Sequence, residues 1–175
     1  NDTVSVPEAS TIKDSNQATT DIIKSAPTAK ETISKPSEYE VLRTNSIAKK
    51  NSAIQTRLEK VLNYTKQTMV AYMSEEDLNR LCAYITEYST GDTLQKISPV
   101  KVDSQLKSID IMHFGWNLGK AFGKKRIHTA TFIKNVFAHT LRDLEIATIE
   151  RKMSHTESEC KIKLNYIFQQ EMSMT

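Results

Sequence analysis

Eight basic side chains lie between positions 120 and 152, where only three acidic side chains oppose them. This segment therefore carries a net charge of +5, whereas the whole chain carries +3. Basic side chains on one exposed face bind phosphate groups, and the free amides at a helix N-terminus bind the same anions. A solvated helical surface or an acidic protein partner would also fit this charge. We expect DNA as the partner, with these binding residues: Lys124, Lys125, Arg126, Lys134, Thr148, Arg151 and Lys152.

Two predicted helices carry most of these candidate residues. The first spans about Thr129 to Leu141 and the second about Asp143 to Met153, which together have the outline of a helix-turn-helix. The second helix would present Thr148, Arg151 and Lys152, residue types that reach phosphates or base edges. The turn between the two helices contains no glycine. We therefore treat the helix-turn-helix as a hypothesis to be tested against the structure.

The last third of the chain resembles a known family. The stretch IHTATFIKNVFAHTLRDLEIATIERKM, continuing through KIKLNYIFQQEM, is similar to the C-terminal region of RteC-type regulators carried by conjugative transposons of Bacteroidetes. The shared features are a helix with paired aromatic residues (Phe132 and Phe137), a Leu-Arg-Asp turn, a basic element ending at Lys152 and a final amphipathic helix. The resemblance implies a helical, DNA-binding regulator of a bacterial mobile element.

One arrangement of residues would instead indicate catalysis. His139, Arg142, His155 and Tyr166 follow the order of the catalytic residues in tyrosine recombinases, where basic groups stabilise a scissile phosphate that the tyrosine attacks. Arg142 and His155 are too close in sequence for the helices that normally separate them. The four histidines also lack the spacing of a zinc site. We expect no enzyme, no metal and no cofactor.

Apolar residues recur at helical spacing in five or six segments after Ser52, and strand signals are almost absent. The sequence therefore predicts an all-α fold, a compact domain of about five or six helices. The first helix should start at Ser52, which has capping-box spacing with Gln55. Ser74 and Gly91 should bound the second helix.

The third predicted helix, about Asp103 to Phe122, is apolar around much of its circumference, which is typical of a helix at the centre of a domain. We expect Trp116 to be buried there, and Asp110 to pair with His113 within the helix. Three glycines four residues apart should let a neighbouring helix approach closely, or else form the seam of a homodimer: Gly115, Gly119 and Gly123.

Three further helices are expected after Gly123. Thr129 should cap the fourth helix, and the fifth should cover about Leu144 to Met153. Thr156 and Glu159 have capping-box spacing before a last amphipathic segment that reaches Phe168.

Residues 1–51 differ from the rest of the chain in composition. Ser, Thr, Ala, Lys and Glu dominate, three of the four prolines lie here, and the opposite charges balance. Such a segment cannot bury enough apolar surface to offset its ordering entropy. We therefore predict a disordered leader over residues 1–51 and a helical domain over 52–175. The start at Asn1 rather than Met indicates a fragment or a processed product.

No apolar run approaches the roughly 20 residues that span a bilayer, so we expect no membrane association. Cys82 and Cys160 are predicted to be buried thiols, which favours a reducing, cytoplasmic location, with a disulfide as the alternative. The leading hypothesis is a non-enzymatic DNA-binding or regulatory protein of a bacterial mobile element. The alternative is a helical protein–protein interaction module with no nucleic-acid role.

Overall fold

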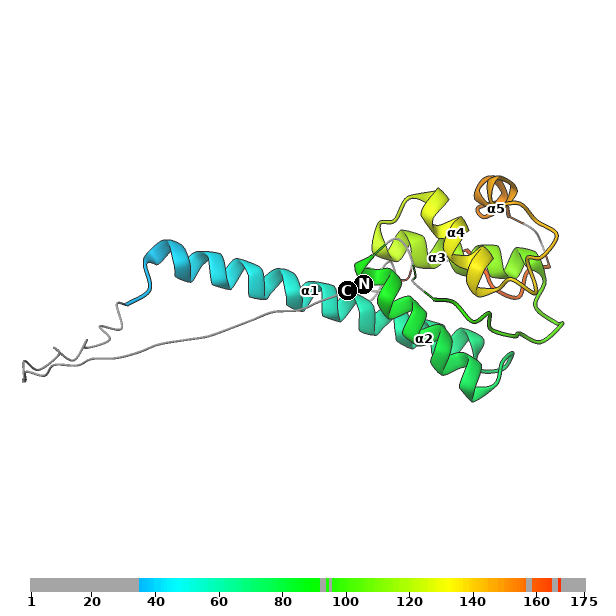
Figure 1. Ribbon diagram of the computed structural model, residues 1–175, viewed down its shortest axis with the longest axis horizontal. Helices are drawn as coiled ribbons and strands as arrows, with labels where there is room; N and C mark the ends of the chain where they lie inside the picture. The colour runs from blue at the N-terminus through cyan, green and yellow to red at the C-terminus, as the bar shows by residue number, and fades with distance from the viewer. Residues whose placement is uncertain (1–34, 92–93, 95, 157–158, 165–166, 168–175) are drawn as a thin grey trace, which may run out of the picture. The chain divides into compact units, whose positions relative to one another are not determined.

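The structure is a computed structural model that describes residues 35–91, 94, 96–156, 159–164 and 167. It confirms the all-α fold, because the described residues form five helices and no strand. The helices are α1 (Glu38–Met69), α2 (Glu75–Thr90), α3 (Ser108–Phe122), α4 (Arg126–Val136) and α5 (Ile146–Lys152) (Figure 1). None of the helices in this described part is both long enough and apolar enough to cross a membrane.

Helix α1 begins at Glu38, well before the predicted start at Ser52. Its capping box is formed by Ser37 and Glu40: the Ser37 hydroxyl accepts from the Glu40 amide at 3.2 Å, and the Glu40 carboxylate accepts from the Ser37 amide at 2.9 Å. Residues 38–57 are all exposed, and Leu58 is the first buried residue of the helix. The predicted leader is thus helical from residue 38, although α1 enters the core only from Leu58. Residues 1–34 lie outside the described part.

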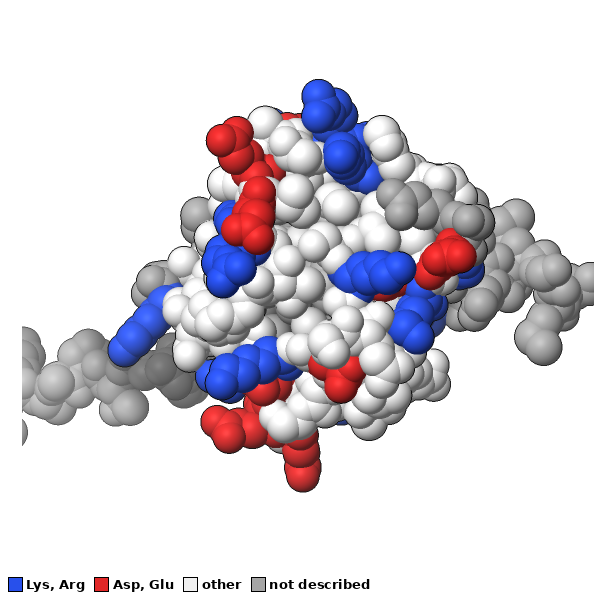
Figure 2. Space-filling model, turned by 90° about the vertical axis from the view of Figure 1, so that its right-hand side faces the viewer, with Lys and Arg blue, Asp and Glu red and all other residues white. Residues whose placement is uncertain are grey.

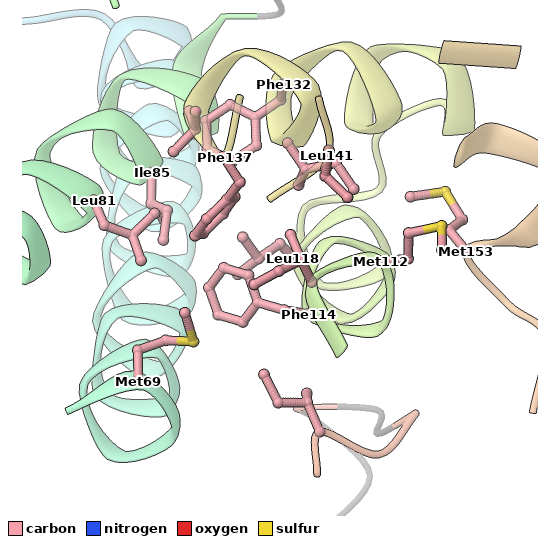
Figure 3. Packing of buried hydrophobic residues seen from close by; sticks show 14 of the residues in the cluster. Met69, Leu81, Ile85, Met112, Phe114, Leu118, Phe132, Phe137, Leu141 and Met153 are labelled. Carbon is pink, nitrogen blue, oxygen red and sulfur yellow. The ribbon is translucent and has the colours of Figure 1, made fainter. Parts of the chain in front are cut away.

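Helix α2 has the predicted ends. The Ser74 hydroxyl accepts from the Asp77 amide at 3.2 Å, and Gly91 is the C-cap, whose amide donates to the Glu87 carbonyl at 3.1 Å. Leu81 and Ile85 point from α2 into the core (Figure 3). The short link between Met69 and Ser74 makes α1 and α2 neighbours, and they lie side by side in Figure 1.

Helix α3 is the buried centre of the fold, as predicted. It starts at Ser108 rather than near Asp103, because the Asp103 carboxylate accepts from the Gln105 amide at 2.8 Å and forms a turn instead. Phe114 and Leu118 of α3 face side chains from the other helices (Figure 3). Gly123, with φ of 66°, ends the helix in the left-handed conformation that favours glycine.

Gly115 and Gly119 bring α3 close to α4. A Cβ atom at Gly115 would lie 2.7 Å from the Ile133 side chain, and one at Gly119 would overlap Thr129 Oγ1. The expectation of a close helix approach is therefore confirmed within one chain. A homodimer seam through these two glycines would require α4 to leave, and Gly123 lies in the turn after the helix.

Thr129 does not cap α4, in contrast to the prediction from the sequence. The left-handed Gly123 reverses the chain at once, so the helix begins at Arg126 with Lys125 as its N-cap. Thr129 is buried inside α4, where its hydroxyl donates to the Lys125 carbonyl at 3.2 Å and lies 2.8 Å from the Tyr88 hydroxyl. The Tyr88 ring stacks on Phe132 with a centroid distance of 4.2 Å, which joins α2 to α4.

The region after α4 departs from the sequence-based predictions in two ways. Residues 137–145 join α4 to α5, a connection longer than the three- or four-residue turn of a helix-turn-helix, so that motif is not confirmed. The predicted last helix is absent from the described residues 159–164, which form turns and irregular structure. Backbone amides there bond to a side chain of α3 instead of to a helix of their own.

Candidate functional site

The two groups of cations that lie far apart in the sequence meet at the end of α5. Arg126 Nε donates to the Glu150 carbonyl at 3.2 Å, and Nη2 donates to the same oxygen and to the Arg151 carbonyl at 3.3 Å. These are carbonyls of the last turn of α5, where a positive charge is favoured by the helix dipole. Lys120, Lys124 and Arg126 line one small pocket here. We call these three cations and their basic sequence neighbours at the two joined helix ends the basic cluster: Lys120, Lys124, Lys125, Arg126, Arg151 and Lys152.

Trp116 lies within the basic cluster rather than deep in the core. Its side chain is only half-buried, in contrast to the predicted full burial. Lys120 Nζ lies 4.5 Å from the ring centroid and Arg126 Cζ lies 5.0 Å from it, within the range of cation–π attraction. The adjoining pocket holds about 30 Å³, which is room for one water molecule and not for a larger ligand.

Three of the seven predicted DNA-binding residues bond to carbonyls of their own chain. Lys124 Nζ donates to the Gly91 carbonyl at 2.8 Å and lies 5.3 Å from the Tyr88 ring, which ties the α3–α4 turn to the end of α2. Lys134 Nζ donates to the Leu141 carbonyl at 2.7 Å and to the carbonyl of residue 142 at 2.9 Å. Together with Arg126, these side chains stabilise the fold.

The other four predicted residues are differently placed. Lys125, Arg151 and Lys152 are exposed, and Thr148 is half-buried on α5. Lys125 is the N-cap of α4, and its side chain makes no capping hydrogen bond with the first-turn amides. These amides and the exposed cations of the basic cluster can bind an anion together.

The surface charge is mixed over the face that Figure 2 shows. Basic and acidic side chains alternate there, and uncharged surface separates them. On this face, contacts to phosphate would have to come from a few local cations, because a broad positive field needs charges of one sign over a large area.

A row of three buried polar side chains on α3 holds the chain that follows α5. We call Asp110, His113 and Asn117 the polar row; each is at most 1% exposed. Asp110 Oδ1 accepts from the amides of Lys161 at 2.6 Å and Ile162 at 3.0 Å, and Oδ2 accepts from the Lys107 amide at 2.9 Å. Asp110 and His113 thus bond to the backbone of other segments rather than form the predicted pair.

The two other members of the polar row continue this pattern. His113 Nδ1 lies 2.7 Å from the Ile162 carbonyl and Nε2 lies 2.6 Å from the His155 carbonyl. The His113 ring thus bridges two backbone carbonyls of the segment that follows α5. Asn117 Nδ2 donates to the Lys163 carbonyl at 2.9 Å and to the Tyr64 hydroxyl at 2.7 Å.

The side chains of Tyr64 on α1 and Cys82 on α2 have shifted pKa values. Burial raises the pKa of the Tyr64 phenol, and its hydrogen bonds with Asn117 and Thr68 only partly oppose the shift. Burial also raises the pKa of the Cys82 thiol against the opposing charge of Lys66. Neither Cys82 nor Cys160 forms a disulfide; Cys160 is buried and Cys82 half-buried. Both effects favour the uncharged forms of these groups.

The residues considered for catalysis do not form a site in the described part of the chain. Arg142 is exposed and lies 3.4 Å from Asp143, and His155 is exposed with its carbonyl bonded to His113. Tyr166 lies outside the described residues. Within those residues, no three His, Cys, Asp or Glu side chains converge as a metal site would require.

No protein-family model matches the chain, and comparisons with curated proteins and with solved structures find no significant match.

Proposed function

We propose that the chain is a non-enzymatic nucleic-acid-binding protein that contacts the phosphate backbone through the basic cluster. The observation that supports this best is the bonding of Arg126 to the last carbonyls of α5. This contact joins the start of α4, where Lys125 is exposed, to the end of α5, which carries the exposed Arg151 and Lys152. In this proposal the exposed cations and the amides of the α4 N-terminus contact the phosphate backbone together.

The finer part of the proposal is a DNA-binding regulator of a bacterial mobile element. It is supported by the resemblance of the last third of the chain to RteC-type regulators and by the packing of α4 against α5. The exposed Arg151 and half-buried Thr148 on α5 are the residues for sequence preference. In this proposal, α5 approaches the duplex while Arg126 and Lys134 hold the α4–α5 pair together.

Fluorescence anisotropy with a labelled DNA duplex tests the proposal. Binding should weaken steeply between about 50 and 200 mM salt. Replacing Lys125, Arg151 and Lys152 together by Ala should reduce the slope of log K against log salt by about 0.9 for each phosphate that the variant no longer neutralises. The chosen residues are exposed, so the melting curve should stay unchanged.

The matched control removes the same charge elsewhere, by replacing the exposed Lys49, Lys50 and Lys101 by Ala. An equal loss of affinity in the control would show that only net charge matters. A wild-type chain without affinity for duplex at about 50 mM salt would overturn the proposal.

A second candidate function, a protein–protein interaction module, is favoured by the exposed part of α1. Ile47 and Ile54 are 48% and 53% exposed and precede the buried Val61 at intervals of one heptad. The apolar stripe that packs α1 onto the core therefore continues along the exposed half of the helix. Figure 1 shows this half of α1 extending away from the other helices. Sedimentation velocity of the wild type and of Ile47→Ser with Ile54→Ser tests whether this stripe binds a second copy. A single monomeric species at high concentration in both would contradict self-association.

A further inference from the structure

A cleft separate from the Trp116 pocket opens between the start of α3 and the two ends of α5. Four residues at the start of α3 form one wall: Lys107, Ser108, Ile109 and Met112. The other wall comes from Leu144 before α5 and from Lys152 and His155 at its end. Its volume is about 390 Å³, within the range of pockets that hold small organic molecules. A small ligand therefore has room in this cleft, whereas the Trp116 pocket holds only a water molecule.

The lining of this cleft has two chemical parts. Three apolar side chains contribute one part: Ile109, Met112 and Leu144. Two exposed ammonium groups, Lys107 and Lys152, and the exposed imidazole of His155 contribute the other. A ligand that matches both parts carries a negative group beside an apolar body.

The nearest carboxylate along α3 does not cancel this positive charge at the cleft. Asp110 is 1% exposed, is not among the lining residues, and accepts three backbone hydrogen bonds, from Lys107, Lys161 and Ile162. Its carboxylate oxygens bond to these backbone amides rather than to the cleft. The described residues that line the cleft include no Asp or Glu.

We propose that this cleft binds a small amphipathic organic anion, with its carboxylate or phosphate at Lys107 and Lys152 and its apolar body on Met112 and Leu144. A fatty-acid carboxylate and the end of an anionic lipid share this chemistry. Inorganic phosphate lacks the apolar body, and an uncharged alcohol lacks the anion, so each matches only one part of the lining.

Lys152 lines the cleft and also belongs to the basic cluster. An anion bound at Lys152 neutralises one of the cations available to a phosphate backbone, next to Arg151. The ligand should therefore weaken nucleic-acid binding, and this step rests on the proposed function. Binding of the ligand itself does not depend on it.

Decanoate, below the concentration at which it forms micelles, is the probe for the free ligand. The ¹³C-labelled methyl of Met112 should shift in the NMR spectrum as decanoate is added to the full chain, and calorimetry should give a single site. Lys107→Gln and Lys152→Gln should each weaken decanoate by about two- to fivefold, as expected for exposed ion pairs. Lys101→Gln, an exposed lysine outside the cleft, should leave the affinity unchanged.

Three further probes test which part of the ligand the cleft recognises and whether the ligand is a free acid or a membrane lipid. Decanol and inorganic phosphate should each shift Met112 less than decanoate does. Vesicles of phosphatidylglycerol distinguish a lipid from a free acid: co-sedimentation that Lys152→Gln weakens, together with an unshifted Met112 in decanoate, assigns the cleft to a lipid. An unshifted Met112 in decanoate without such co-sedimentation overturns the proposal, as does equal binding of decanoate and decanol.

The DNA arm separates this proposal from the proposed function. If decanoate binds and also lowers the affinity for duplex, both the anion-binding cleft and the proposed nucleic-acid-binding function stand. If decanoate binds and the chain has no duplex affinity at about 50 mM salt, the cleft stands and the proposed function fails. If duplex binding is present and decanoate leaves it unchanged while bound, the shared role of Lys152 is wrong.

Discussion

The first half of α1 and the whole of α3 are both helical, but different interactions hold them in that form. Residues 38–57 of α1 are exposed along their whole length, and local features support them: the capping box of Ser37 and Glu40, and side-chain bonds such as Gln55 to Glu59 at 3.1 Å. Helix α3 is buried on nearly every side and bonds to distant segments through the polar row. Local interactions thus specify α1, and tertiary contacts specify α3.

The consequence is a difference in how the two helices should respond to substitution. A change on the exposed half of α1 should follow helix propensity and capping, because water remains the solvent for every side chain there. A change on α3 should follow packing and hydrogen-bond satisfaction, because a buried group left without its partner keeps the full cost of desolvation. Four measurements test this contrast.

The largest effect is expected at Asp110. Asp110→Ala leaves three backbone amides without their acceptor, each at a cost of about 1–3 kcal/mol. We expect the free energy of unfolding to fall by about 3–5 kcal/mol in urea titrations followed by circular dichroism. Glu40→Ala on α1 also removes an acceptor from one backbone amide, but an exposed one, and should cost less than about 1 kcal/mol. Equal losses in the two variants would contradict the contrast.

A substitution by alanine should have opposite effects on stability in the two helices: destabilising in α3 and slightly stabilising in the exposed half of α1. Gly119→Ala places a Cβ atom where it overlaps Thr129 Oγ1, so despite the better helix propensity of alanine it should lower the free energy of unfolding by about 1–3 kcal/mol. Ser46→Ala, on the exposed half of α1, should slightly raise helix content. A stabilised Gly119→Ala, measured by thermal unfolding, would show that α3 and α4 separate easily.

Local signals are enough to predict the fold class and several helix ends. Ser74, Gly91 and Gly123 each act on their own turn of backbone, and the structure places them where the sequence predicts. The start of α1 is mispredicted because the composition before Ser52 indicates disorder. A capping box is present in the sequence at Ser37, but the similar spacing at Ser52 directly precedes the apolar stripe, and Ser52 lies inside the helix.

Contacts between distant residues explain what the sequence could not predict. The described part of the last predicted helix is irregular because Asp110 accepts from two amides there, and no local pattern encodes that contact. The charge of the basic segment is evident from the sequence, but Lys124 and Arg126 bond to carbonyls of residues 91 and 150. Which cations stabilise the fold and which remain exposed depends on these tertiary contacts. The one sequence signal for the polar row is its spacing of polar residues on an otherwise apolar helix.

A pH dependence should arise where α1 joins the core. Because burial raises the pKa of Tyr64 above its usual 10.0, the folded state favours the neutral phenol. Its contribution to stability is complete below pH 10.0 and is lost as the pH rises through the folded-state pKa. Tyr64→Phe should cost about 1 kcal/mol at neutral pH, since Asn117 loses an acceptor, and the difference from wild type should narrow under alkaline conditions. Urea titrations at several pH values check this, with Tyr39→Phe as the control for loss of an exposed hydroxyl.

The smallest effect comes from two serines with the same local role. Ser37 and Ser74 each cap a helix by accepting from a backbone amide three residues later, at 3.2 Å in both cases. Losing such a cap costs a helix about 1 kcal/mol. Ser74→Ala should lower the free energy of global unfolding by that amount, because α2 packs into the core from its second turn onward.

Ser37→Ala should leave the urea midpoint unchanged, because residues 38–57 contribute no buried side chain. The loss should appear only locally, as an acceleration of about fivefold in hydrogen exchange of the first amides of α1 that bond within the helix, which include Val41. If Ser37→Ala shifts the midpoint as much as Ser74→Ala does, the exposed half of α1 unfolds together with the core, and tertiary contacts or self-association must hold it in place.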